Sequence, residues 1–311
     1  MMVITLLSLL PIMFLIAMGV VLRARNLIDA GFWLPCEKLN YYYLFPALMF
    51  SLVGKADLSE FPVKPIAFSI LGAVFIGGVA LWLWRIWLKQ SGPIFSSVMQ
   101  GALRPNTYIG VAAAAATYGH TGLTVTSISI AVAIPLLNVA SIVVLMHYGE
   151  GSKPGWPHVI KALIKNPVIL SVLAGLLFNS SGLSLPVAID SILKILGGAS
   201  LPLGLLAVGA GLNIRAARAG HGPVMQSSFV KLLLVPVATL FLGTSLGISG
   251  AVLATVVLFN ALPCTPSAYI MAKLLGGDHQ LAAGIITIQT LVAAVTIPLV
   301  LMLTQLLTYT G

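Results

Sequence analysis

The stretch Gly101-Ala-Leu-Arg-Pro-Asn-Thr-Tyr-Ile-Gly110 constrains the fold most, because it sets an arginine, a proline and an asparagine together inside an apolar segment. Proline lacks a backbone donor and clashes with the preceding turn, so a helix cannot pass through Pro105 unbroken. An arginine at the centre of a membrane helix costs roughly 2.5–3.5 kcal/mol. A chain tolerates both features mainly where the broken backbone lines a cavity or is buried in protein.

A second stretch of the same kind is Asn260-Ala-Leu-Pro-Cys-Thr-Pro-Ser-Ala-Tyr-Ile270. Both stretches contain Pro-x-x-Tyr-Ile, in which Pro105 corresponds to Pro266. Two interrupted helices in corresponding halves of a membrane protein are typical of a transporter's binding site. We therefore expect the two breaks to cross and to form such a site.

The composition indicates a membrane protein, since 59% of the 311 residues are hydrophobic and only 7% are charged. Soluble domains carry about 25% charged residues. The net charge of +9 does not indicate a nucleic-acid partner, because the basic residues stand at the ends of apolar segments. No metal-ligand spacing, disulfide framework or catalytic dyad is found, so we expect neither an enzyme nor a cofactor.

We predict an all-α polytopic fold with ten transmembrane helices, the fourth and ninth of which contain the breaks. The predicted spans are 2–22, 33–53, 65–88, 94–117, 122–147, 163–181, 186–212, 225–247, 250–273 and 280–307.

Lysine and arginine set the predicted orientation, because cytoplasmic connections carry an excess of them. Those assigned to the odd-numbered connections are Arg23, Arg25, Lys38, Arg85, Lys89, Lys153, Lys161, Lys165, Arg215, Arg218, Lys231 and Lys273. On the other side, Lys55 and Lys64 are balanced by Asp57 and Glu60. We therefore expect a multi-pass protein of the cytoplasmic (inner) membrane with both termini outside.

The two halves repeat one another at a constant offset of 156, which relates Pro11 to Pro167 and Pro46 to Pro202. We divide the chain into a first five-helix repeat (1–150), a cytoplasmic linker (151–162) and a second repeat (163–311). Five spans is an odd number, so the second repeat must be inverted relative to the first.

The candidate substrate-binding residues lie in the two breaks and on the helices next to them. They are Arg104, Asn106, Tyr108, Asn138, Asn260, Thr265, Ser267 and Tyr269, and the prolines of the breaks are Pro105, Pro263 and Pro266. Crossing breaks would present helix N-termini that attract an anion, and Arg104 would add a fork for a carboxylate. Gln289 and Thr290 are weaker candidates.

Each candidate also has a structural interpretation. Arg104 could compensate the negative end of the preceding half-helix. Asn106, Thr265 and Ser267 could only cap helices, with Thr265 as the cap before Pro266 at the first helical position. The two tyrosines could simply be packed in the interior. Asn138 and Asn260 could hold helices together.

Acidic residues are absent from the predicted mid-membrane region. Glu37 is the nearest on the inner side, and it neighbours Lys38. A carboxylate at the breaks would be the expected carrier of a proton or sodium ion. The sequence therefore does not indicate which ion, if any, is coupled to transport.

Several motifs, taken in order, resemble those of the auxin efflux carrier family in its short prokaryotic form, within the bile/arsenite/riboflavin transporter superfamily. They are Leu44-Phe-Pro-Ala-Leu48, Pro105-Asn106 with Tyr108-Ile-Gly110, Leu201-Pro-Leu203 with Gly209, Leu262-Pro263 through Ala272, and Thr296-Ile-Pro-Leu299. The resemblance covers essentially the whole chain.

The resemblance implies a scaffold domain of spans 1, 2, 6 and 7 and a moving transport domain of spans 3–5 and 8–10. It implies elevator-type transport with the substrate held where the broken helices cross. By this likeness Pro105 and Pro266 are the crossover prolines, Asn106 contacts substrate and Asn138 fills a polar place on the fifth span. The role of Arg104 depends on the physical argument alone.

The expected function is secondary transport of a small organic anion, such as malate, malonate or an auxin-like acid. The alternatives are a sodium-coupled symporter of a bulkier, bile-acid-like anion and a membrane sensor that does not transport. Besides the anion, the expected partners are membrane lipid and a second copy bound through the scaffold.

Overall fold

Every regular element in the described part of the chain is a helix. The computed structural model describes residues 2–56, 61–150, 164–217 and 221–309, together with 155, 157, 160 and 161. The helices are α1 (Met2–Ala24), α2 (Ala30–Leu39), α3 (Phe45–Gly54), α4 (Val63–Leu88), α5 (Gly92–Leu103), α6 (Thr107–Tyr148), α8 (Pro167–Ser180), α9 (Val187–Gly211), α10 (Ile214–Ala217), α11 (His221–Phe229), α12 (Val235–Ser245), α13 (Gly250–Ala261), α14 (Ser267–Leu275) and α15 (His279–Tyr309). Two π-helical turns, η1 (Asn40–Leu44) and η2 (Val230–Leu234), join α2 to α3 and α11 to α12.

Six helices of the described residues are long and apolar enough to cross a membrane. They are Leu7–Ala24, Val63–Leu88, Thr107–Tyr148, Val187–Gly211, His221–Ser245 and His279–Leu306. The prediction of an all-helical polytopic membrane protein is confirmed. Asp57, Glu60, Lys153 and Arg218, which entered the charge count, and much of the 151–162 linker lie outside the described residues.

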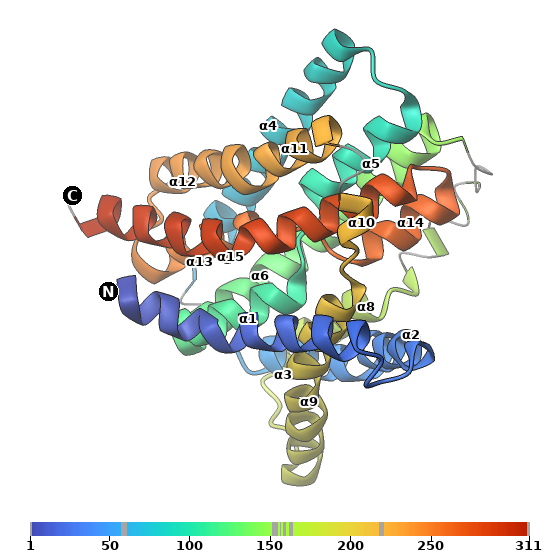
Figure 1. The fold of residues 1–311 in the computed structure, drawn as a ribbon. Helices are drawn as coiled ribbons and strands as arrows, with labels where there is room; N and C mark the ends of the chain where they lie inside the picture. The colour runs from blue at the N-terminus through green and yellow to red at the C-terminus, as the bar shows by residue number, and fades with distance from the viewer. Residues whose placement is uncertain are drawn as a thin grey trace.

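The helices form two groups (Figure 1). One group contains α1, α2, α3, α8 and α9, in which α1 packs along α9 and α3 packs against both α8 and α9. The other contains α4, α5 and α11 to α15, with α4 against α12 and α13 against α15. α6 contacts members of both groups.

Glycine allows α1 and α9 to approach closely. A Cβ on Gly209 would lie 1.9 Å from the carbonyl oxygen of Ile16, and one on Gly19 would lie 2.1 Å from that of Leu206. Such close approach through small residues is a common way for membrane helices to associate, since lipid offers no hydrophobic drive between them.

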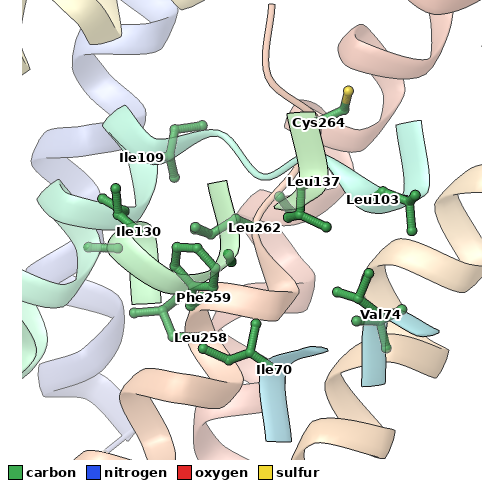
Figure 2. Packing of buried hydrophobic residues seen from close by; sticks show 14 of the residues in the cluster. Ile70, Val74, Leu103, Ile109, Ile130, Leu137, Leu258, Phe259, Leu262 and Cys264 are labelled. Carbon is green, nitrogen blue, oxygen red and sulfur yellow. The ribbon is translucent and has the colours of Figure 1, made fainter. Parts of the chain in front are cut away.

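A buried apolar cluster surrounds the interrupted helices. Figure 2 shows Ile70 of α4 near Leu258 and Phe259 of α13, with Ile109 and Ile130 of α6 close by. All five side chains are at most 5% exposed. The first break, which includes Ile109, therefore borders a buried apolar cluster.

One charged residue departs from its predicted place. Lys231, counted from sequence among the basic residues of a cytoplasmic connection, lies in η2 within the apolar run His221–Ser245 and is 0% exposed. The assignment to a connection was wrong, because Lys231 already falls inside the predicted span 225–247 and the observed helix begins still earlier, at His221.

Candidate functional site

The two breaks meet in the interior of the molecule. The backbone nitrogen of Asn106 donates to the carbonyl oxygen of Pro263 at 2.8 Å, and that of Thr265 donates to the carbonyl oxygen of Arg104 at 3.3 Å. Pro105 and Cys264 thereby form an isolated antiparallel bridge. These bonds satisfy backbone groups that a broken helix would otherwise leave unpaired away from water.

Local backbone chemistry explains the first break. α5 ends at Leu103 and Arg104 is extended, with φ −92° and ψ 112°, because the residue before a proline avoids the helical region. The side chain of Asn106 then caps α6 by accepting a hydrogen bond from the backbone nitrogen of Ile109 at 3.4 Å. The capping role weighed for Asn106 is confirmed.

The second break differs from its prediction. Thr265 was expected to cap a helix with Pro266 at its first helical position, but α14 begins at Ser267 and has no side-chain cap. The hydroxyl of Thr265 lies 3.3 Å from that of Ser267, while its carbonyl oxygen accepts a hydrogen bond from the backbone of Ala268 at 3.1 Å. Pro266 already has helical angles, so the turn closes through the backbone instead.

A cavity of about 440 Å³ adjoins the breaks. The residues at the breaks that line it are Arg104, Pro105, Thr107, Tyr108, Thr265, Pro266 and Ser267. The helices that follow the breaks contribute Ile270, Met271 and Leu274 of α14, and Ile134, Leu137, Asn138 and Ile142 of α6. The first helix group contributes Leu34, Glu37, Lys38, Tyr41, Tyr42, Phe45, Asn166 and Val168. Its walls therefore come from both helix groups and are largely apolar.

Arg104 reaches this cavity from the first break and is 7% exposed. Its guanidinium donates to the hydroxyl of Ser267 at 3.0 Å and to the sulfur of Met271 at 3.1 Å. Neither partner carries a charge, and the ion pairs found among the described residues do not include Arg104. The cation is thus held in place without being neutralised, which leaves it able to attract an anion.

The opposite wall contains residues that the sequence analysis did not assign to the site. Glu37 and Lys38 of α2, Tyr41 of η1 and Asn166 line the cavity. Glu37 and Lys38 were interpreted as a neighbouring pair near a span end, but no ion pair joins them in the described part of the chain. Only the tertiary packing of the first helix group brings these four residues to the cavity, and no sequence motif indicated that they would lie there.

Not every predicted site residue reaches the cavity. The described lining lacks Asn106, Asn260, Pro263 and Tyr269. Asn260 donates to the hydroxyl of Thr239 at 2.7 Å and to the carbonyl oxygen of Ile70 at 3.3 Å, so it joins three helices. The ring of Tyr269 packs edge-on against His279 at 5.6 Å.

The remaining candidates also divide. Tyr108 lines the cavity and packs edge-on against Phe45 of the first helix group, with ring centroids 4.8 Å apart. Asn138 lines it from α6 and is 8% exposed. Gln289 instead supports the second break, because its side-chain oxygen accepts a hydrogen bond from the backbone of Cys264 at 2.9 Å. The hydroxyl of Thr290 donates a hydrogen bond to the carbonyl oxygen of Ile286.

Comparison with known proteins agrees with this architecture. The sequence model of the membrane transport protein family matches residues 156–301. An uncharacterized transporter of Methanothermobacter thermautotrophicus is 25% identical over 298 residues, which cover 94% of this chain and 96% of that protein. The uncharacterized transporter YfdV of Escherichia coli K12 is 25% identical over 307 residues, covering 94% and 95% respectively.

Together, the helical fold, the paired breaks and these matches indicate a membrane transporter. These matches support the resemblance to transporters of the auxin efflux carrier type that the sequence motifs indicated.

Proposed function

We propose that this transporter carries a small organic anion and holds the anion's carboxylate at Arg104. The observation that carries the proposal is the buried guanidinium, which lines the cavity and has only neutral partners. A carboxylate would complete its fork geometry with charge-assisted hydrogen bonds. Desolvation in the cavity strengthens that attraction.

The cavity walls favour an anion with an apolar body. Leu34, Leu137, Ile142, Ile270 and Leu274 face the space next to Arg104. Burying apolar surface against such walls contributes about 25 cal/mol per Å². The second carboxylate of a dicarboxylate would have to bind at Lys38, and the negative charge of the neighbouring Glu37 would repel it. Among the expected substrates we therefore favour a monocarboxylate with an aromatic or branched body over malate or malonate.

The proposed architecture is two inverted five-helix repeats with α5/α6 and α13/α14 as the crossing helices. The scaffold is α1, α2, α3, α8 and α9, and the transport domain is α4 to α6 and α11 to α15. A cavity with walls from both sets supports this division, because sliding one set along the other would change which side the cavity faces. The proposed location is the cytoplasmic membrane, with both termini outside.

Ligand-dependent thermal stability tests the proposed function. Purified protein would be heated with phenylacetate, indole-3-acetate, malonate, malate or a bile acid, each with and without sodium. A ligand at 100 times its Kd adds about 2.7 kcal/mol to stability, which gives a clear rise in Tm. We expect the largest rise with phenylacetate or indole-3-acetate, independent of sodium.

Two variants sharpen this test. Arg104→Ala should lose the rise, whereas Arg25→Ala, which removes an exposed arginine, should retain it. A rise that survives in Arg104→Ala would contradict the binding role of Arg104. A rise seen only with bile acid and sodium would replace the proposal with the sodium-coupled symporter, and no rise with any anion would favour the sensor.

A further inference from the structure

Lys231 has no role in the proposed anion site and no partner in the structure. It is 0% exposed, and its amine nitrogen is buried without a hydrogen-bond partner. It lies in η2, inside one of the apolar helices long enough to cross a membrane. An isolated ammonium in such a place is costly, so an ionisable residue there is a functional candidate.

No acidic group compensates Lys231 from the elements that pack against η2. These elements are α4, α5, α11, α12, α13 and α15. Their ionisable residues, with those of the adjoining breaks, are Lys64, Arg85, Arg104, His221, Cys264, His279 and Tyr309. Within these described elements, then, every ionisable group is a base, a thiol or a phenol. Arg85 is engaged elsewhere, stacked on the rings of Phe95 and Tyr148.

A chain of hydrogen bonds joins the helix of Lys231 to the second break. Ser227, four residues earlier on the same helix, donates to the carbonyl oxygen of Val98 at 3.0 Å and accepts from the side chain of Gln289 at 3.2 Å. Gln289 in turn accepts from the backbone of Cys264 at 2.9 Å. Electrostatic interactions reach the Cys264 thiol from both Lys231 and Arg104.

The interior next to the breaks contains polar side-chain atoms that make no hydrogen bond. Both side-chain atoms of Gln100 and the amide nitrogen of Asn106 are buried without hydrogen-bond partners. A π-helical turn, which often marks a functional position in a helix, carries Lys231. These features single out this lysine for more than packing.

We propose that Lys231 is the proton-binding site of the transporter, with a neutral amine when the cavity is empty and an ammonium when an anion is bound. The reaction is the addition of one proton to the amine lone pair, with no other bond made or broken. With the cavity empty, a proton on Lys231 would add a second positive charge to an interior that already holds Arg104. A bound carboxylate neutralises Arg104 and removes that opposition. Anion binding and proton binding then strengthen each other.

The first test needs no substrate. The unfolded chain keeps a proton on this lysine to a higher pH than the folded, empty protein does. Over that pH range the unfolded state binds more protons, so stability rises with pH. Tm would be measured in detergent between about pH 6 and 9. In Lys231→Met, the increase of stability with pH should be smaller than in the wild type by the amount that one proton contributes. Lys273→Met, which removes an exposed lysine of α14, should keep it.

Folding of the variant is not expected to fail, because a hydrophobic residue of similar size often replaces a buried charge without loss. Lys231→Gln provides a second variant without the titrating amine and should behave like Lys231→Met. Parallel pH profiles in the wild type and both variants would overturn the proposal. Such parallel profiles, shifted by the same amount at every pH, are what a lysine charged in both the folded and the unfolded state would produce.

The second test concerns coupling and rests on the proposed function. Calorimetric titration with phenylacetate in two buffers of different ionisation enthalpy reports the protons taken up on binding. We expect uptake approaching one proton in the wild type and none in Lys231→Met. Binding without uptake in the wild type would overturn the coupling. A complete lack of phenylacetate binding would count against the proposed substrate class, while the stability test would still decide the state of Lys231.

Discussion

At the scale of single residues, Arg104 is held by neutral groups and not by an acid. Ser267 fixes one nitrogen of the guanidinium at 3.0 Å, and the sulfur of Met271 contacts another at 3.1 Å. Both partners belong to the second break or the helix that follows it, whereas Arg104 belongs to the first. The orientation of the guanidinium therefore depends on the pairing of the two breaks.

Ser267→Ala should weaken anion binding about fivefold, because a hydrogen bond that positions the guanidinium contributes about 1 kcal/mol. Titration of phenylacetate into the variant would give the Kd. Ser245→Ala, at the exposed end of α12, serves as the control and should leave the Kd unchanged. An unchanged Kd in Ser267→Ala would show that Arg104 holds its position without this hydrogen bond.

At the scale of elements, the first break ends one helix and starts another within three residues. Asn106→Ala removes the cap of α6 and should lower the stability of the protein by about 0.5–2 kcal/mol. Asn106→Ser, which keeps a capping oxygen, should recover most of the loss. Thermal unfolding of both variants without ligand measures the difference, and equal Tm values for Asn106→Ala and the wild type would refute the capping role.

α6 is bent at Gly119, whose φ of 53° and ψ of −130° lie outside the helical region. A Cβ there would meet nothing within 4 Å, so the backbone conformation and not the available space requires glycine. Gly119→Ala should therefore destabilise the protein by more than about 1 kcal/mol. Gly222 on α11 also has open space around it but does not have a positive φ, so Gly222→Ala should leave the stability unchanged. A similar Tm for the two variants would contradict this reasoning.

At the scale of the whole molecule, α6 touches the first helix group closely where Tyr108 lies beside Gly204 of α9. A Cβ on Gly204 would lie 2.9 Å from the ring of Tyr108 and 2.8 Å from the side-chain nitrogen of Asn40. If the groups slide past each other during transport, the absence of a side chain at this position lets the ring pass.

Gly204→Ala should slow uptake into proteoliposomes severalfold while the protein still folds and inserts, because the methyl group obstructs this contact. Gly198→Ala, on the same helix but with open space around it, should transport normally. Wild-type rates in Gly204→Ala would argue against movement along this surface.

The sequence by itself determined the class of the protein and the position of both breaks. Apolar segments of membrane-spanning length and prolines that cannot continue a helix act through local chemistry, so they are visible without a fold. Arg104, Pro105 and Asn106 were predicted at the first break for that reason. The expectation that the two breaks cross followed from the repeat between the halves, while the hydrogen bonds to Pro263 and Thr265 were found only in the structure.

Only the tertiary structure decided which polar residues share a site, because that depends on how distant helices pack. It placed Asn260 between helices rather than in the cavity, and it brought Glu37 and Lys38 to the cavity wall. It also placed Lys231, which the sequence analysis had counted with a connection, in the buried middle of the helical run that begins at His221. Burial is a property of neighbours in space, and a lysine in sequence gives no sign of which neighbours it will have.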